Sequence, residues 1–418
     1  MKEEYNNPPE LLAPVQDWKT LKFIKGVPDA VYFGVQEYKM RKKAQNFNRD
    51  DLAKVVSFCH SQDPPMKAYL CTNILIYTEE MNELENLIQE AKNANVDAII
   101  AHDLAAIQLA KEYDLNFHIS TQANISNLSS AQFFEELGAD RIILARELSL
   151  EQIKEIKNGL KNTEIECFIH GSMCTSISGR CYFSATLEGS EKYSANRGKC
   201  TQPCRREWRV IDDNNNELIY NGKMFLNSKD LCMIEYIPEL IRAKIDAFKI
   251  EGRMKDPLYV KTVVSCYKKA IKSFYNNTFT ENKVKTWKER LSKVYNRGFH
   301  TGFYFKRPTP EEIQLNERGN ISNYKKKYLG RVLSYQDNVK TANIEIEAKH
   351  CRLKEGDEII VEGQGDTYII EKANNILKQG NQIESIERKE GDEPIKLNIT
   401  LKEKVSPNDK IFKLDKYT

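Results

Sequence analysis

Short apolar runs alternate with amphipathic segments along the first two thirds of the chain. Eight such runs lie before residue 275, over residues 11–13, 30–34, 68–70, 98–101, 117–120, 142–145, 167–170 and 247–250. Runs that are apolar throughout are typical of parallel strands covered by helices. Helical patterns lie between most of them, for example over residues 80–94, 130–137 and 149–157.

This alternation predicts an α/β fold, a (β/α)8 TIM-like barrel over residues 1–275, because the number of repeats and their length of about 270 residues both suit that fold. An open, doubly wound sheet is the alternative, but it normally carries a glycine-rich phosphate turn, and no GxGxxG is present. Two helix starts show capping signals. Ser149 with Gln152 fits a capping box, and Asn48 precedes two acidic residues.

One connection is much longer than the others. Residues 172–230 separate the seventh apolar run from a helix predicted to start near Leu231. A loop of this length is usually functional, and this one follows a strand, at the barrel face where active sites lie. Residues 276–327 then form a charged helical segment and a linker. Alternating short strands over 328–418 predict a small all-β barrel.

Composition narrows the class of protein. Lys and Arg number 63 against 60 Asp and Glu, a net charge of +3, which excludes a globally basic nucleic-acid coat protein. No signal-peptide pattern and no run of about 18 apolar residues occurs, so we expect a cytoplasmic protein without a membrane span. Residues 191–209 are locally basic, with Tyr193 and Trp208 interleaved. That segment could bind RNA or simply be solvated.

Six of the ten cysteines fall between residues 167 and 232. Four of them, Cys174, Cys181, Cys200 and Cys204, lie in the long connection, and four thiolates suit zinc or an iron–sulfur cluster. Only the last two are spaced like a structural zinc pair, so the spacing favours a cluster, with zinc and unliganded thiols as alternatives. Cys232 is either a core residue on its helix or a fourth ligand. We expect the remaining cysteines to pack in the core, namely Cys59, Cys71, Cys167, Cys266 and Cys351.

Several long sequence motifs indicate which family the chain resembles. They are His170-Gly-Ser-Met-Cys174, Ser178-Gly-Arg-Cys181, Asn196-Arg-Gly-Lys-Cys200-Thr-Gln-Pro-Cys-Arg205, Asn227-Ser-Lys-Asp-Leu-Cys232, Phe248-Lys-Ile-Glu-Gly-Arg253 and Arg297-Gly-Phe-His-Thr-Gly-Phe-Tyr304. Together they closely resemble the peptidase family U-32, the collagenase-like peptidases. The resemblance extends from about residue 10 to 305.

Within that family the chain looks most like the tRNA uridine hydroxylases. The resemblance implies formation of 5-hydroxyuridine at the tRNA wobble position without O2, with prephenate as oxygen donor and a 4Fe-4S cluster. It implies Cys174, Cys181 and Cys200 as ligands, with Cys204 or Cys232 as the fourth. Sister branches hydroxylate 23S rRNA cytidine or the ubiquinone ring. A partner subunit of the same family is left open.

The ends of the predicted strands and the long connection supply candidate site residues. Prephenate is a dicarboxylate and needs cations, for which arginine is well suited. The predicted catalytic residues are Glu251, His170 and Arg253, the first two for proton transfer. The predicted substrate-binding residues are Arg180, Arg146, Lys249, Gln122, Asn124, Lys229 and Arg197, of which Gln122 and Asn124 could bind the uracil edge. Polar packing at the barrel mouth is the alternative for each of them.

The peptidase activity in the family's name finds little support in the residues. No HExxH and no GxSxG is present. A Cys–His peptidase would need a free thiolate near His170 or His102, and a cluster would occupy the loop thiols. Proteolysis, rRNA cytidine hydroxylation and zinc-stabilised RNA binding therefore stand as alternatives to tRNA hydroxylation.

Overall fold

The computed structural model describes residues 7–35, 46–178, 180–217, 224, 226–313, 317, 319–363 and 365–416. The chain divides into two compact units. One joins Ile24–Ile321 to the segment before Trp18, and the other joins Ser322–Thr418 to Trp18–Phe23. Within the described ranges, no helix combines the length and the apolar character needed to cross a membrane.

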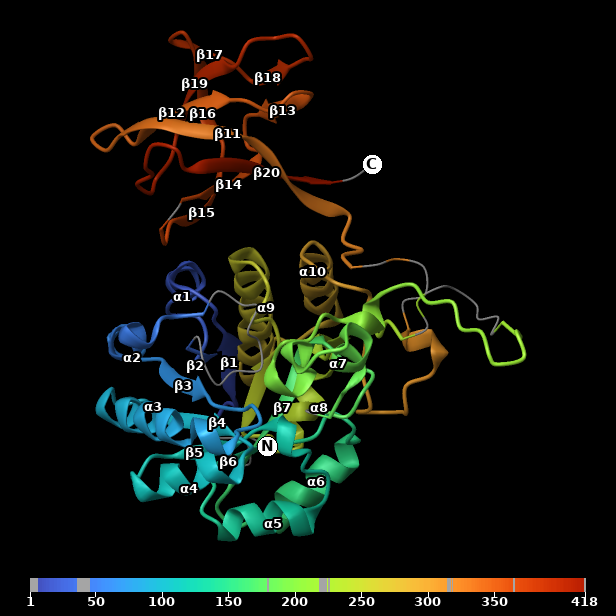
Figure 1. Cartoon of the computed structure of the whole chain (residues 1–418). Helices are drawn as coiled ribbons and strands as arrows, with labels where there is room; N and C mark the ends of the chain where they lie inside the picture. Colours follow the sequence, from blue (N-terminus) through green and yellow to red (C-terminus); the bar gives the residue numbers. More distant parts are fainter. Residues whose placement is uncertain are drawn as a thin grey trace. The chain divides into compact units, whose positions relative to one another are not determined.

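Eight parallel strands close into a barrel in the first unit (Figure 1). They are β1 (Glu10–Pro14), β2 (Ala30–Phe33), β3 (Lys67–Cys71), β4 (Ala98–Ala101), β5 (Phe117–Ile119), β6 (Arg141–Ile143), β7 (Glu164–Ser172) and β9 (Ala247–Ile250). Closure comes from β9, which pairs in parallel with both β1 and β7. Each strand coincides with one of the eight apolar runs, so the predicted TIM-like barrel is confirmed.

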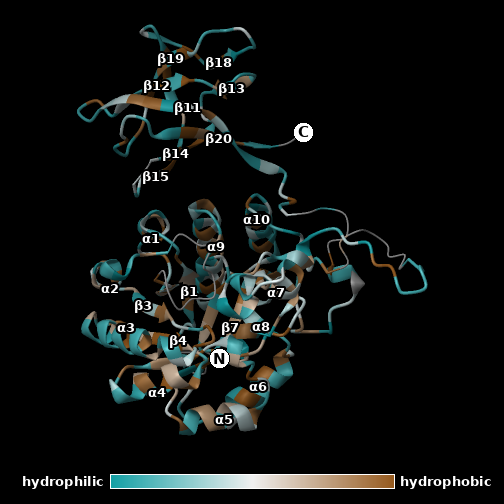
Figure 2. Ribbon diagram, viewed as in Figure 1, coloured by the Kyte–Doolittle hydropathy of each residue, from teal (hydrophilic) through white to brown (hydrophobic). Residues whose placement is uncertain are grey.

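Helices cover the outside of this barrel. They are α2 (Leu52–His60), α3 (Met81–Asn93), α4 (Leu104–Glu112), α5 (Leu128–Glu136), α6 (Leu150–Gly159), α8 (Ile237–Arg242) and α9 (Pro257–Tyr275), with α1 (Trp18–Ile24) after β1 and α10 (Glu281–Ser292) after α9. Helix α3 buries Leu84, Leu87, Ile88 and Ala91, the spacing of one helical face. Figure 2 shows apolar and polar residues alternating along these helices. The Ser149–Gln152 capping box forms, but the Asn48 side chain caps nothing, so that prediction is wrong.

The long connection carries its own elements. Helix α7 (Phe183–Glu188) lies within it, and the chain returns as β8 (Asp230–Cys232), antiparallel to β7. Strand β10 (Phe299–His300) then pairs with β8. The helix predicted near Leu231 is therefore wrong. The residues there pair with the extended end of β7, and Pro238, in the first turn of α8, marks the later helix start.

The second unit is built from antiparallel strands, which confirms the predicted all-β domain. Its larger sheet has the order β15-β14-β20-β11-β12-β19-β16-β17, and β13 pairs with β18 beside it. The strands are β11 (Tyr324–Gln336), β12 (Thr341–Ile346), β13 (Cys351–Lys354), β14 (Glu358–Glu362), β15 (Tyr368–Lys372), β16 (Asn374–Lys378), β17 (Asn381–Gln382), β18 (Ser385–Arg388), β19 (Ile395–Thr400) and β20 (Lys410–Lys416). Strand β12 buries every second residue, as a half-covered sheet requires.

Candidate active site at the barrel mouth

A pocket with an empty volume of about 390 Å³ lies at the carboxyl ends of the barrel strands. This is the end where TIM-barrel enzymes keep their active sites. Five residues predicted from the sequence line it together: Gln122, Arg146, Lys249, Glu251 and Arg253. Residues that the sequence reasoning missed also line it, among them Tyr32 and Asn73. Both lie at or just past strand ends, so the same strand-end rule could have found them.

Several buried polar atoms of this mouth have no hydrogen-bond partner. Arg253 is only 4% exposed, yet its Nε and Nη1 are unpartnered. The same holds for Arg146 Nε, Gln122 Oε1, Asn124 Oδ1 and Asn73 Oδ1. Buried polar groups in native proteins are nearly always hydrogen-bonded, and an unmade bond costs about 1–3 kcal/mol. Such a concentration of unmade bonds indicates a site whose ligand supplies the missing partners.

The three cations of the mouth differ in how far their charged groups are already paired within the chain. The Lys249 ammonium lies 2.6 Å from the buried carboxylate of Glu166, which neutralises it. The Arg146 guanidinium lies 4.1 Å from the centre of the Phe168 ring and donates one long bond, 3.4 Å, to the Ser172 carbonyl. Arg253 and Arg146 are therefore the cations best placed to bind an anion.

His170 occupies a different place. It is 2% exposed, Nδ1 lies 3.2 Å from the Tyr267 hydroxyl, and the rings of Tyr259 and Phe299 pack around it. Burial lowers its pKa to about 4, so the imidazole is neutral near pH 7. The next residue, Gly171, has φ +109°, and a Cβ there would lie 2.4 Å from the Glu251 carbonyl oxygen. His170 thus helps to build the wall beside Glu251 rather than lining the pocket.

Four thiols of the long connection are not buried in the core, and three of them affect the pKa of the fourth, Cys204. Burial raises the pKa of the Cys204 thiol, and the charges of Cys174, Cys200 and Cys181 raise it further. The Gln202 backbone N–H donates to Cys200 Sγ at 3.2 Å. Within the described part of the chain, however, no three His, Cys, Asp or Glu side chains are close enough together to hold a metal ion. The metal-ligand role of these thiols stays a prediction.

Cys232 is separate from these four. It lies on β8, 6% exposed, with its Sγ 3.8 Å from the Tyr267 hydroxyl. Burial raises its pKa to about 11, and Lys288 and Glu235 are charged residues near it. The structure therefore places it in the core, although on a strand and not on the helix that the sequence predicted.

Arg205 holds the cysteine-bearing segment in place. Its guanidinium is buried and donates to the Asn227 side chain at 2.9 Å and to the backbone carbonyls of Ser228 and Met173. It thereby ties the segment after β7 to the approach to β8, next to Cys204. The sequence reasoning counted Arg205 only as one charge of a basic segment, because its partners come from distant positions.

The rest of that basic segment is largely neutralised within the chain. Arg197 forms an ion pair with Glu80, and Arg206 and Arg209 pair with Glu188 and Glu217. These pairs favour the solvated-loop interpretation over an RNA surface. Two further predicted binding residues also lie away from the mouth pocket. The Lys229 ammonium donates to the Glu311 carbonyl, and the exposed Arg180 lies near His102, whose pKa is lowered by burial and also by that charge.

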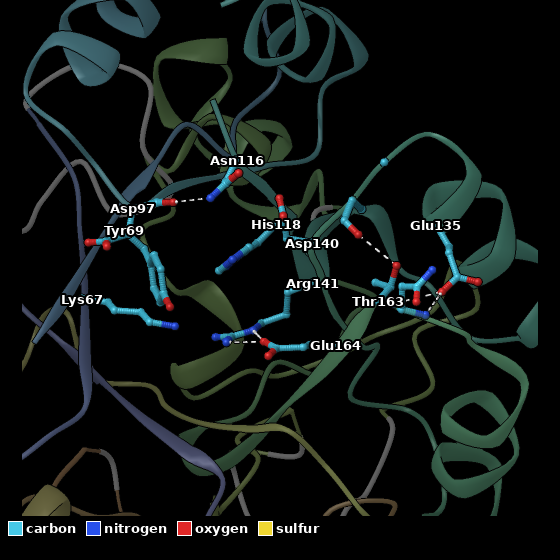
Figure 3. Close-up of a pocket in the computed structure, with 13 residues that line it drawn as sticks. Lys67, Tyr69, Asp97, Asn116, His118, Glu135, Asp140, Arg141, Thr163 and Glu164 are labelled. Atoms are coloured by element: carbon cyan, nitrogen blue, oxygen red, sulfur yellow. Dashed lines mark hydrogen bonds and ion pairs between the residues drawn. The ribbon is translucent and has the colours of Figure 1, made fainter. Parts of the chain in front are cut away.

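The opposite end of the barrel has a larger pocket, about 1130 Å³, shown in Figure 3. Here the charges satisfy one another. Arg141 is 2% exposed and pairs with Glu10 at 2.6 Å, Glu164 at 2.5 Å and Glu166 at 3.3 Å. Glu135 accepts three backbone N–H groups, from residues 161, 162 and 163. This end of a TIM barrel serves stability, and its paired charges fit that role.

The fold and the mouth define a TIM-barrel protein with a ligand site at the carboxyl ends of its strands. The chain belongs to peptidase family U32, whose sequence model matches residues 17–314. It is 40% identical over 403 residues to an uncharacterized protease of Methanocaldococcus jannaschii, covering 94% of this chain and 96% of that one. It is 36% identical to a collagenase of Porphyromonas gingivalis, covering 97% and 98%. It is 37% identical to tRNA hydroxylation protein P1 of Bacillus subtilis, covering 84% and 82%.

Proposed function

We propose that this protein is a tRNA hydroxylase that converts uridine to 5-hydroxyuridine at the wobble position, without O2 and with prephenate as the oxygen donor. The observation that carries the proposal is the pair of arginines at the barrel mouth, buried Arg253 and half-buried Arg146, each with at least one buried nitrogen that lacks a partner. The relative named tRNA hydroxylation protein supports RNA as the substrate. A tRNA substrate also implies a cytoplasmic protein.

Arg253 and Arg146 are the proposed binding groups for the two carboxylates of prephenate. A guanidinium binds a carboxylate through charge-assisted hydrogen bonds, and these are strongest where water is excluded. Arg253 offers two unpartnered donor nitrogens and Arg146 offers one. Lys249 adds positive charge to the floor of the pocket, but its bond to Glu166 keeps it in place rather than free to follow a ligand.

The uncharged polar groups and Glu251 complete the proposed roles. The unpartnered amide oxygens of Gln122 and Asn124 can accept hydrogen bonds from a ligand. Glu251 lines the pocket directly after β9 and is the proposed proton-transfer group. His170, neutral and enclosed by aromatic rings, is proposed to position the end of β7 and not to exchange protons with substrate.

A 4Fe-4S cluster fits the donor set of the long connection. Cys174, Cys181, Cys200 and Cys204 would hold it, because all four lie in this one connection and none of them is buried in the core. Cys232, buried on β8 apart from them, would not. When bound, such a cluster supplies electron-transfer chemistry beside the mouth. The backbone N–H of Gln202 that points at Cys200 suits a thiolate ligand.

Proteolysis is disfavoured at the place where two paired strands set a histidine opposite a cysteine. This pair is His170 and Cys232, on β7 and β8. A Cys–His nucleophile needs a thiolate and an accessible imidazole. Here burial lowers the pKa of His170 to about 4 and raises that of Cys232 to about 11, so both stay neutral and inaccessible.

Nucleoside mass spectrometry tests the proposed function. The protein is produced in a strain lacking its own 5-hydroxyuridine enzymes, and the tRNA is digested and analysed. Wild type and the surface control Arg242→Gln should restore 5-hydroxyuridine, and Arg253→Gln should not. An unchanged nucleoside profile with wild-type protein that contains iron would overturn the proposal. Cleavage of gelatin by the same preparation would then favour the peptidase.

A further inference from the structure

A second cavity lies beside Cys174, inside the barrel unit and apart from the mouth pocket. Its empty volume is about 1160 Å³, and its walls come from the segments after β6 and β7 and from residues 300–313. Arg146 lines both this cavity and the mouth pocket. A molecule bound here would therefore lie next to one bound at the mouth.

One part of the wall is apolar. Met173, Ile177, Phe303 and Pro308 all line the cavity, and Ile177 remains 49% exposed. An exposed branched side chain and an aromatic ring beside open space are typical of a site for a flat, weakly polar group.

The other part of the cavity wall is polar, and some of its polar atoms lack hydrogen-bond partners. His300 is 9% exposed, and neither of its ring nitrogens makes a hydrogen bond of normal geometry. Burial lowers its pKa, and the nearby Glu312 carboxylate and Lys229 backbone act in the opposite direction. Glu147 Oε2, on the same cavity, also lacks a partner. Glu312 lines the cavity too, but it is satisfied by Thr309 at 2.7 Å and Lys306 at 2.9 Å. Arg146 Nε, on the border with the mouth pocket, also lacks a partner, so the unmade bonds of this cavity belong to Arg146, Glu147 and His300.

We propose that this cavity binds the unstacked uracil base of a single-stranded RNA segment, an inference that rests on the proposed function and names where its substrate base is held. The faces of a pyrimidine are flat enough to stack on Phe303. Its edge alternates donors and acceptors, which the imidazole of His300 can complement. The carboxylate of Glu147 only accepts, so it matches the N3–H of uracil and not the bare N3 of cytosine.

Phosphate is a poorer occupant of the same cavity. Two carboxylates, Glu147 and Glu312, line it against one arginine. A phosphate would be repelled by both, whereas a neutral base would not. The base and the dicarboxylate would then meet at Arg146, which is where a transfer of oxygen between them requires them to meet.

Photocrosslinking tests this placement without requiring turnover. The full-length iron-loaded protein is mixed with an RNA hairpin whose loop carries one 4-thiouridine and no other uridine, then irradiated and digested with trypsin. We expect the crosslink in the peptide of residues 298–306, which contains His300 and Phe303. A crosslink only in other peptides, or none at all, overturns the inference. So does displacement of the crosslink by a collagen-like peptide, which would make the cavity a peptide site.

Steady-state kinetics of two phenylalanine variants provide a matched comparison. Phe303→Ala should raise the KM for tRNA about tenfold, the loss of one stacked base, and leave the KM for prephenate unchanged. Phe305→Ala, two residues away and stacked on Tyr236 instead, should change neither. A crosslink at residues 298–306 without any 5-hydroxyuridine would contradict the proposed reaction but not the cavity. Active protein whose Phe303→Ala variant keeps its KM for tRNA would contradict the cavity alone.

Discussion

Buried charged side chains are paired within the chain at the amino-terminal end of the barrel, whereas some of them lack partners at its mouth. At the amino-terminal end, Arg141 is paired with Glu10, Glu164 and Glu166. Figure 3 shows the pair with Glu164, and it shows Glu135 of α5, which accepts the backbone N–H of Thr163. At the mouth, Arg253 is equally buried, but two of its nitrogens have no partner. Pocket size would have selected the wrong end, because the amino-terminal pocket is the larger of the two.

The difference separates stability from function. Charges that are paired within the chain make the fold more stable in the absence of any ligand. Buried polar groups without partners make the fold less stable, and at the mouth several of them lie together in one pocket, where a ligand can supply what is missing. Glu166 joins the two ends, because one carboxylate oxygen binds Arg141 and the other binds Lys249 under the mouth pocket.

The largest effect is expected on the mouth side, in the long connection. Cys204→Ser should abolish both iron binding and hydroxylation, because Cys204 is one of the four proposed cluster ligands. Cys232→Ser should retain both, since that thiol is buried on β8. Iron content and the visible absorbance of anaerobically purified protein measure the first effect. Iron lost from Cys232→Ser and kept by Cys204→Ser would reverse the assignment.

A matched pair of arginine variants compares the two ends directly. Arg141→Met should lower the free energy of unfolding of the barrel by about 3–5 kcal/mol, because it leaves buried carboxylates uncompensated. Arg253→Met should change it by less than about 1 kcal/mol, because it removes no hydrogen bond made by Nε or Nη1. Urea unfolding followed by circular dichroism measures both. Equal losses would mean that the two ends do not differ as described.

A smaller effect is expected on the stability of the fold at acidic pH. Burial alone would raise the pKa of Glu10, but Arg141 and Lys67 hold it below its ordinary value of 4.5. A carboxyl with a depressed folded pKa stabilises the fold above its unfolded pKa, and this stabilisation is lost as pH falls through the folded pKa. Wild type should therefore lose stability below pH 4.5, and Glu10→Gln should show a shallower loss. Identical acid profiles in thermal melts would argue against this pairing.

The strands could be predicted from the sequence because each is an unbroken apolar run, and a closed parallel barrel needs such runs. The strand-end rule likewise brought Arg253, Glu251 and Gln122 to one pocket. The rule failed for residues whose contacts are made with partners far away in the sequence. Glu80 occupies Arg197, and Tyr267 with its neighbouring rings encloses His170. Strand β8 was missed because three residues carry too little pattern, and its pairing with β7 is non-local.

The choice among cysteines shows the same limit. The resemblance left Cys204 and Cys232 open as fourth ligands, because both positions match motifs of the family. The fold places Cys232 opposite His170 on the paired strands β7 and β8, and Cys204 in the long connection, and this difference in position supports our proposal of Cys204. No one-dimensional pattern contains that information.

The affinity of prephenate for the purified protein tests the central claim most directly. Isothermal titration calorimetry is carried out on wild type, Arg253→Gln and the control Arg242→Gln. Loss of a charge-assisted bond to a buried carboxylate is worth about 1.5–3 kcal/mol, so Arg253→Gln should weaken binding at least tenfold while the control matches wild type. Equal affinities for all three proteins would contradict the claim that the unpartnered arginines of the mouth are the anion site.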